Sequence, residues 1–273
     1  MGLGVFQSLR KGVAGQQPLP RVDAFRDLYE EGVTPRQGQV VMVAGRSGSQ
    51  KSGFALYWVA SMGLPTLYFS ADMAPFTAGV RLASIATGMA SKEVEAMMAT
   101  TSGRAQIERA AASLPIELSF GSPITWEQVE DELNCYVMLH NEFPKVVVFD
   151  NLMDFAGCES DYEAQMGVMQ DVTAFARTTG ATVLVLHHAS DKTLDAKNNP
   201  WKPPSRDQIK NGMAEKPELT LGVALDPINK EFYIACLKQR DGFCDPSASR
   251  FVSLKCDPAR TWFGARGGNG GAA

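Results

Sequence analysis

The sequence lacks long apolar segments and closely spaced cysteines. No apolar run approaches the ~18 residues of a membrane span, and no apolar segment follows Arg10 and Lys11 as a secretory signal requires. The cysteines are odd in number, five, and include no Cys-x-x-Cys pair, which argues against a structural zinc site and for a reducing compartment. We therefore expect a cytoplasmic protein without membrane contacts.

The sequence also lacks an excess of basic residues. It has 26 Lys and Arg against 30 Asp and Glu, for a net charge of −4. Any nucleic acid would have to bind through a local patch or through a channel in a multimer. At 273 residues, with 45% hydrophobic and 21% charged residues, the chain suits one sizeable α/β domain or two small ones.

The strongest local pattern covers residues 41 to 52. An apolar run, 41–44, is typical of a buried strand and leads into a loop rich in glycine and serine, before a helical segment, 53–60. This order is that of a phosphate loop, in which Lys51 reaches the outer phosphates and the Ser52 hydroxyl ligates Mg²⁺. The motif has Gln50 in place of its second glycine. A glycine- and serine-rich turn that only happens to precede a lysine is therefore an alternative. The residues predicted to surround the phosphates are Gly45, Arg46, Ser47, Gly48, Ser49, Gln50, Lys51 and Ser52.

Apolar runs and helical segments alternate along the rest of the chain. We expect strands over 39–44, 66–70, 116–120, 146–150, 181–188, 231–237 and 250–255, and helices over 22–31, 53–60, 76–89, 91–112, 126–141 and 161–178. This alternation predicts an α/β fold with a mostly parallel sheet, helices on both faces, and ligands at the carboxyl ends of the strands. We expect an arm or linker over 1–20, a single domain over 21–264 and a disordered glycine-rich tail over 265–273.

Polar residues follow or end several of these strands. Asp72 comes just after one strand, Asp150 ends another, and His187 and His188 end a third. Because the carboxyl ends of parallel strands meet at one edge of a sheet, these side chains should lie near the phosphate loop. An apolar strand that ends in an acid downstream of a phosphate loop is typical of a Walker B strand, whose carboxylate holds Mg²⁺ through water.

The stretch 189–218 is polar and rich in proline and lysine, which predicts a long mobile loop. Its basic residues either contact DNA or form a solvated surface. The candidates for DNA contact are Lys192, Lys197, Lys202 and Arg206.

The order of these motifs resembles the RecA-like motor domain of DnaB-type replicative helicases, from about residue 18 to 263. Arg46 and the run 51–56 look like that family's phosphate loop and following helix, and 148–152 looks like its Walker B strand. The run 69–73 is similar to its second strand, with Asp72 where the family has Glu.

Two further positions resemble the family. His188 stands where the family places a Gln or His that senses the γ-phosphate. The run from Lys238 through Arg240 to Gly242 resembles the Lys-x-Arg-x-Gly stretch that points into the ATP site of the neighbouring subunit.

The resemblance implies a RecA-like P-loop NTPase core that uses ATP and Mg²⁺. The partners would be single-stranded DNA and further copies of the chain, in a ring such as a hexamer or in a filament, with ATP sites between subunits. If a phage encodes the protein, it would work in the bacterial host's cytoplasm. The implied catalytic residues are Lys51, Asp72, His188, Lys238 and Arg240, and Mg²⁺ would be held by Ser52 and Asp150.

Each of these side chains also has a simpler interpretation. Asp72 could be a solvated carboxylate at a strand end, His188 a packed side chain, and Lys238 with Arg240 a solvated hairpin tip.

Three functions are compatible with the sequence. The first is an ATP-driven helicase or translocase on single-stranded DNA, in replication or recombination. The second is a structure-specific nuclease on the same fold, with a metal held by Asp72, Asp150, Asp154, His187 and His188. The third is a DNA-binding recombination mediator with weak or no ATP hydrolysis, which the departures at Gln50 and Asp72 favour.

Overall fold

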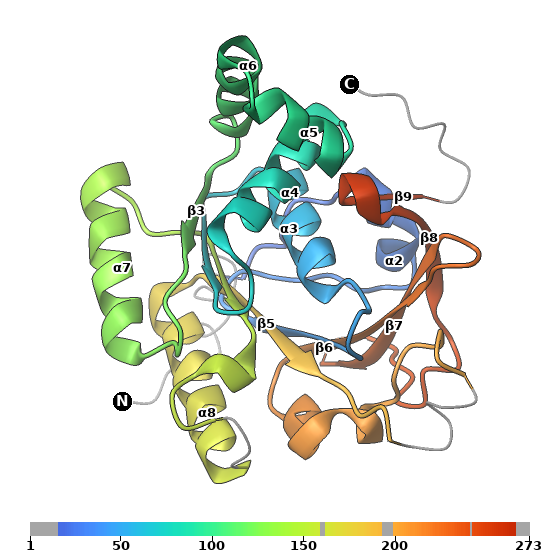
Figure 1. Cartoon of the computed structure of the whole chain (residues 1–273). Coiled ribbons are helices and arrows are strands. Elements are labelled where there is room, and N and C mark those ends of the chain that lie inside the picture. Colours follow the sequence, from blue (N-terminus) through green and yellow to red (C-terminus); the bar gives the residue numbers. More distant parts are fainter. Residues whose placement is uncertain (1–15, 159–161, 193–198, 241, 266–273) are drawn as a thin grey trace.

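One sheet organises the molecule (Figure 1). The computed structural model describes residues 16–158, 162–192, 199–240 and 242–265. Within them the sheet has nine strands in the order β3-β2-β4-β5-β1-β6-β7-β8-β9. The six strands from β3 to β6 pair in parallel and the last three pair antiparallel. The α/β class and the mostly parallel sheet predicted from the sequence are confirmed.

The strands form where the sequence has apolar, β-branched runs. They are β1 (Val40–Gly45), β2 (Thr66–Ser70), β3 (Ile116–Ser119), β4 (Val146–Asp150), β5 (Thr182–His188), β6 (Leu219–Asp226), β7 (Glu231–Gln239), β8 (Val252–Asp257) and β9 (Trp262–Ala265). Two of these, β6 and β9, were not predicted. β6 is an apolar run with a glycine at its centre, which weakens the strand pattern, and β9 has only four residues.

The helices match the predicted segments with one exception. They are α2 (Arg26–Glu30), α3 (Lys51–Met62), α4 (Pro75–Thr87), α5 (Ser91–Met98), α6 (Thr101–Ala111), α7 (Trp126–His140) and α8 (Tyr162–Thr179). The single helix expected over 91–112 is wrong, because the chain breaks at Thr100. There the Thr100 hydroxyl accepts a 3.1 Å hydrogen bond from the Gly103 amide and caps a second helix, α6.

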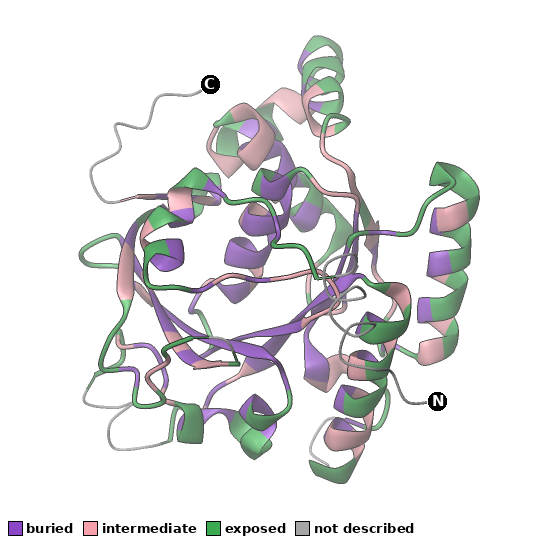
Figure 2. Ribbon diagram, turned by 180° about the vertical axis from the view of Figure 1, so that it is seen from behind, coloured by how far each residue is buried: buried purple, intermediate pink, exposed green. Residues whose placement is uncertain are grey.

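Both faces of the sheet are buried, so its strands are apolar throughout rather than alternating. One face packs against α2, α3 and α4, with Phe54 and Trp58 of α3 at its centre. The other packs against α7 and α8, through residues such as Leu133 and Val172. Figure 2 shows the central strands buried and the outer sides of α7 and α8 exposed. No described helix is both long enough and apolar enough to cross a membrane.

The stretch predicted as a long mobile loop is largely packed where the structure describes it. Residues 203–215 contain two short 3-10 helices, η3 (Arg206–Gln208) and η4 (Lys210–Glu215), and bury Ile209, Met213 and Ala214 against the second face of the sheet. The prediction failed because a few apolar side chains spaced among polar ones do not form a periodic pattern. Residues 193–198, which include Lys197, lie outside the described residues, as do 1–15 and 266–273 of the predicted arm and tail. In the described part of that arm, Leu19 is buried.

Candidate nucleotide site at the carboxyl ends of the strands

The predicted site residues meet because their strands are neighbours. In the sheet Gly45 of β1 pairs with His188 of β5, and Ser70 of β2 pairs with Asp150 of β4. β4 and β5 also pair with each other. The phosphate loop, Asp72, Asp150 and His188 therefore come to one edge of the sheet, as their positions at strand ends predict.

The phosphate loop has the backbone of a tight turn into a helix. Gly48 and Gln50 both have left-handed conformations, with φ of 74° and 63°. Gln50 therefore occupies a conformation that favours glycine, in the position where the motif has glycine. At Gly45 a Cβ would overlap Ser49 Oγ and lie 2.8 Å from the Val223 carbonyl oxygen, so the loop begins where only glycine fits. Helix α3 starts directly afterwards, at Lys51.

Lys51 and Asp150 form the buried centre of the site. Only 8% of Lys51 and 3% of Asp150 is exposed. Burial lowers the pKa of Lys51, and the nearby Asp150 carboxylate opposes that shift. Burial raises the pKa of Asp150, while hydrogen bonds from Tyr68 and Ser52 and the charge of Lys51 counteract it. The Tyr68 hydroxyl donates to Asp150 Oδ2 over 2.7 Å.

Asn151 joins the two residues expected to act on the terminal phosphate. Its Nδ2 lies 3.2 Å from Asp72 Oδ2, to which it donates, and 3.4 Å from His188 Nε2. Asn151 is fixed in place by two further hydrogen bonds. Its Oδ1 accepts from the backbone N–H of Met153, and its backbone N–H donates to Asp154 Oδ2. Asp72 is exposed, whereas burial lowers the pKa of His188, helped by the positive charges of Lys51 and Lys210.

These residues fit ATP with Mg²⁺. The ammonium of Lys51 suits the outer phosphates, and the amides of a loop that leads into the N-terminus of α3 favour an anion. The hydroxyl of Ser52, hydrogen-bonded to the carboxylate of Asp150, supplies the oxygen ligands that Mg²⁺ prefers. The glycine at position 45 lets the start of the loop pack closely against Ser49 and Val223 of β6.

Lys238 and Arg240 lie at the other end of the sheet. β7 runs antiparallel to β6, so Lys238 pairs with Thr220 and Gln239 with Leu219. The start of the phosphate loop, Gly45, pairs with Val223, which lies three residues beyond Thr220 and four beyond Leu219 along β6, or about 10 to 13 Å. Lys238 Nζ donates to the Glu215 carbonyl, and Arg240 Nη2 lies 3.6 Å from Glu218 Oε1. The two residues cannot reach the phosphate loop of their own chain.

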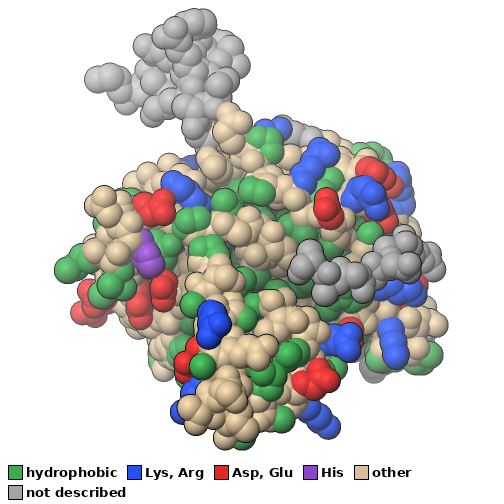
Figure 3. Space-filling model, turned by 90° about the horizontal axis from the view of Figure 1, so that it is seen from above, with side chains coloured by type: hydrophobic (Ala, Val, Ile, Leu, Met, Phe, Trp, Pro, Cys, Tyr) green, Lys and Arg blue, Asp and Glu red, His purple; other side chains and the backbone are tan. Residues whose placement is uncertain are grey.

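The candidate DNA contacts are scattered. Lys192 and Arg206 are exposed, Lys202 is half-buried, and Lys197 lies outside the described residues. Arg206 and Lys202 belong to the packed stretch that covers the sheet. Figure 3 shows another face of the molecule, seen from above Figure 1, on which basic and acidic side chains are interspersed.

The metal cluster that a nuclease needs is not formed by the described residues. Among them, no group of three or more His, Cys, Asp and Glu side chains is arranged to hold a metal ion. His187 is buried and faces away from the carboxylates, since its Nε2 lies 3.1 Å from the Lys210 carbonyl oxygen. Asp154 caps the short helix η2 (Leu152–Asp154) instead.

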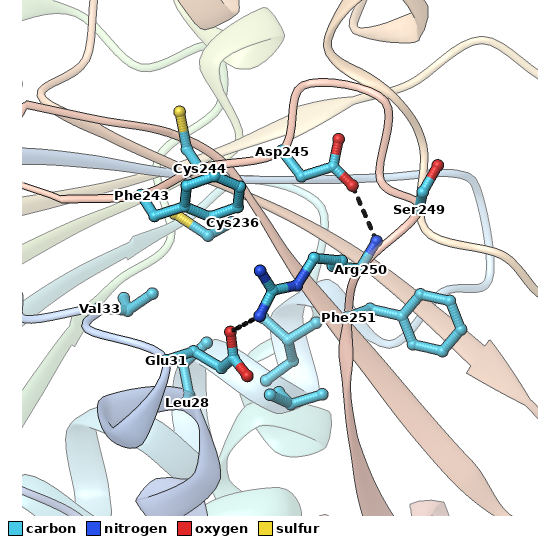
Figure 4. Close-up of a pocket in the computed structure, with 12 residues that line it drawn as sticks. Leu28, Glu31, Val33, Cys236, Phe243, Cys244, Asp245, Ser249, Arg250 and Phe251 are labelled. Carbon is cyan, nitrogen blue, oxygen red and sulfur yellow. Dashed lines mark hydrogen bonds and ion pairs between the residues drawn. The ribbon is translucent and has the colours of Figure 1, made fainter.

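A cavity of about 240 Å³ lies elsewhere, between α2 and the strands β7 and β8 (Figure 4). Arg250 reaches across it to Glu31, and the two side chains form a 2.7 Å ion pair. The lining residues come from the end of α2, from β7 and from the chain that leads into β8. The cavity is therefore separate from the phosphate loop.

Sequence reasoning missed three residues of the site: Tyr68, Asn151 and Lys210. Tyr68 is hidden within an apolar strand, where an aromatic residue is expected to be core. Asn151 directly follows Asp150, and its position next to a strand-end acid was a usable signal. Lys210 approaches Lys51 and His188 from a segment distant in sequence, so nothing local predicts it.

A family model described as an AAA domain matches residues 19–193, more than half of the chain. The chain belongs to the AAA domain family. The chain is 33% identical over 270 residues to the gene 65 protein of Mycobacterium phage L5, covering 90% of this chain and 91% of that protein. It is 27% identical over 227 residues to the gene 65 protein of Mycobacterium phage D29, covering 79% and 94%.

Solved structures similar to this AAA domain include an ATPase domain that gives a TM-score of 0.75 and 14% identity, with 96% of each chain covered. A DnaB-like replicative helicase also gives a TM-score of 0.75 and 14% identity, over 97% of this chain and 68% of that one. The RadB recombinase gives 0.55 and 15% identity, over 86% and 95%. The resemblance to the DnaB-type motor domain is confirmed at the level of the fold.

Proposed function

We propose that this AAA domain hydrolyses ATP to drive a helicase-like or translocase-like motor on single-stranded DNA. One observation carries the proposal. The strand ends bring Ser52 into hydrogen-bond contact with Asp150, with the charge of Lys51 nearby and Asp72 and His188 joined through Asn151, in the fold of helicase ATPase domains. The phage relatives suggest that the protein works in the cytoplasm of a bacterial host.

Each residue has a physical role in this proposal. Lys51 offsets the charge of the outer phosphates, and Ser52 with Asp150 holds Mg²⁺, which stabilises the charge that develops on the phosphates. Asp72 orients or deprotonates the attacking water, and Asn151 keeps its carboxylate in place. His188 reports the loss of the γ-phosphate. Lys238 and Arg240 act on the site of the next copy in a ring or filament, where they stabilise transition-state charge.

DNA would be held by its phosphates, so its binding should weaken as the salt concentration rises. Lys192, Lys197, Lys202 and Arg206 are the proposed contacts, repeated once in each copy. Repetition around an assembly explains how an acidic chain can bind an acidic polymer.

One observation favours a second candidate, a metal-dependent nuclease. The carboxylates of Asp72 and Asp150 add to the effect of burial in raising the pKa of Asp154, so the three acids lie within electrostatic reach of one another. Neighbouring carboxylates are a common way to hold catalytic metal ions. The geometry opposes this candidate, because Asp154 and His187 are engaged elsewhere.

The test measures phosphate release and DNA cleavage, with and without single-stranded DNA, for the wild type and for Lys51→Ala and Asp150→Ala. Lys92→Ala, an exposed lysine on α5, is the matched control. DNA-stimulated hydrolysis that Lys51→Ala abolishes supports the motor. Cleavage without ATP that survives Lys51→Ala and is lost in Asp150→Ala would replace it with the nuclease. DNA binding with neither activity would identify a mediator.

A further inference from the structure

The arginine of the phosphate loop is held by a distant part of the chain. Arg46 is 7% exposed. Its Nη1 donates to the Lys202 carbonyl over 2.7 Å, and its Nη2 donates to Gln208 Oε1 over 3.0 Å. The guanidinium thus joins the loop to the segment 202–210, which we call the basic segment because it carries Lys202, Arg206 and Lys210.

The basic segment is also fastened to the end of β5, beside His188. Ala189 pairs with Ile209 in a β-bridge, and the Ser190 amide donates to the Gln208 carbonyl over 2.8 Å. His187 contacts the Lys210 carbonyl. Gln208 is central, because its Oε1 accepts from both Arg46 and the Ser205 amide. The segment therefore touches the phosphate loop on one side and the strand of the proposed γ-phosphate sensor on the other.

Lys51 completes a chain of contacts from the nucleotide site to the basic segment. Its Nζ lies 3.2 Å from the carbonyl oxygen of Arg46, to which it donates. A phosphate bound by Lys51 would compete with this carbonyl for the ammonium, so occupancy of the site bears on the backbone that carries the Arg46 side chain. Any movement of Arg46 would bear on Lys202 and Gln208, because its buried guanidinium donates to both.

The exposed side of the same segment presents positive charge. Arg206 and Lys210 are exposed, and Lys210 is close enough to the site for its charge to act on both Lys51 and His188. A phosphate polymer lying along this surface would thus be within electrostatic reach of the groups that bind the nucleotide.

We propose that Arg46 is a positioning residue that couples occupancy of the phosphate loop to the placement of the basic segment, and so links ATP binding to the binding of single-stranded DNA. This inference rests on the proposed function. It differs from a purely structural role for Arg46, because a structural role changes stability and leaves the two ligands independent. Coupling requires that each ligand change the affinity of the other by the same factor.

The experiment measures the dissociation constant of the full chain for a fluorescent oligo-dT, with and without a non-hydrolysable ATP analogue and Mg²⁺. For the wild type we expect the ratio of the two constants to differ from one by roughly 5-fold or more, the usual size of such coupling. Arg46→Lys keeps the charge and loses the two-pronged hydrogen bonding, so its ratio should fall towards one. Arg36→Lys is the matched control, since Arg36 also donates from Nη1 to a backbone carbonyl, that of Gln16, away from the phosphate loop.

A second readout reports on the basic segment itself. Hydrogen exchange of the wild-type peptides over 202–210 should change when the analogue is added, and the change should be lost in Arg46→Lys at an unchanged melting temperature. A wild-type ratio in Arg46→Lys, or wild-type exchange over 202–210 that ignores the analogue, overturns the inference while leaving the motor intact. A wild type that binds no nucleotide overturns the proposed function itself, and the inference with it.

Discussion

The two ends of the central sheet carry opposite halves of one proposed chemistry. At the carboxyl ends of the parallel strands, Lys51 and Asp150 are buried together, with Asp72 and His188 beside them. At the opposite end, Arg240 lies near the start of β6 on the surface of the molecule. The carboxyl ends carry the groups proposed to bind the nucleotide, and the opposite end carries cations proposed to act on the site of a neighbouring copy.

The contacts of Arg240 show how it can be released. Glu218 faces both Arg240, at 3.6 Å, and Arg177, at 3.5 Å, and it also accepts a hydrogen bond from the Val40 amide. If Arg240 leaves, Arg177 and Val40 still satisfy the carboxylate. The ion pair is exposed on the Arg240 side, so little stability is lost with it. If Lys238 and Arg240 act as proposed, a complete site needs two copies of the chain.

The largest effect is expected from removing Arg240, at the end of the sheet opposite the phosphate loop. Arg240→Ala should lower DNA-stimulated ATP hydrolysis by about 10³-fold, the usual contribution of an arginine that acts across an interface, without weakening nucleotide binding. The turnover rate and the nucleotide dissociation constant check this. Arg177→Ala, which removes the other partner of Glu218, is the control and should keep most of the rate. Equal losses in the two variants would show that only the Glu218 contact matters.

A smaller loss of hydrolysis is expected from changing Asp72, beside the candidate nucleotide site. Asp72→Asn should lower the rate of hydrolysis by about 10²-fold, as loss of a general base does, and should leave nucleotide affinity nearly unchanged. The amide oxygen of the new side chain can still accept from Asn151 Nδ2, so the geometry is kept. Single-turnover rates measure the effect, with the exposed Asp171→Asn of α8 as control. A wild-type rate in Asp72→Asn would reduce Asp72 to a solvated carboxylate.

His187, buried in β5 next to His188, makes the stability of the fold depend on pH. Burial lowers its pKa from 6.5 to about 4. The unfolded chain therefore binds a proton that the folded chain excludes between these values, so stability falls as pH falls from 6.5 towards 4, by about 1.4 kcal/mol per pH unit from this residue. His187→Gln keeps a donor for the Lys210 carbonyl and cannot titrate, so its stability should fall less steeply. Urea unfolding at several pH values measures both slopes, and parallel slopes would contradict the assignment.

The smallest effect concerns the departure from the loop motif. Gln50 has a left-handed backbone conformation, which glycine adopts without strain. Gln50→Gly should therefore raise stability by about 1 kcal/mol and strengthen ATP binding. Lys230→Gly is the matched control because Lys230 is also left-handed, with φ of 53°, in the turn between β6 and β7. It should gain similar stability with unchanged ATP affinity. Melting curves and nucleotide titrations test the pair. Unchanged or weaker ATP binding in Gln50→Gly would show that the glutamine is not a defect.

Much of the sheet could be predicted because its central strands are short apolar runs bounded by turns, and polar residues at their ends mark the ligand edge. The order of β4 and β5 beside β1 brings Asp150 and His188 together, and the general behaviour of parallel sheets was enough to expect this. The ends of α5 and α6 were harder, since the break at Thr100 depends on one side-chain cap inside a helical pattern.

The contacts between distant segments could not be predicted. Nothing in the sequence near Arg46 indicates that it donates to Lys202 and Gln208, because that pairing exists only once residues 203–214 cover the sheet. Nothing near Tyr68 indicates its hydrogen bond to Asp150 either, because that bond depends on the pairing of β2 with β4. A single-sequence pattern records which side chains are apolar and how they are spaced, and it does not record which surfaces meet.

The most direct test of a site completed across two copies mixes two inactive variants. Lys51→Ala keeps Arg240, and Arg240→Ala keeps the phosphate loop, so random assembly should rebuild a complete site at roughly one interface in four. We predict that each variant alone hydrolyses almost no ATP with single-stranded DNA and that the mixture recovers a clear fraction of the wild-type rate. A mixture as inactive as its parts, in assemblies shown to contain both variants, would contradict the account.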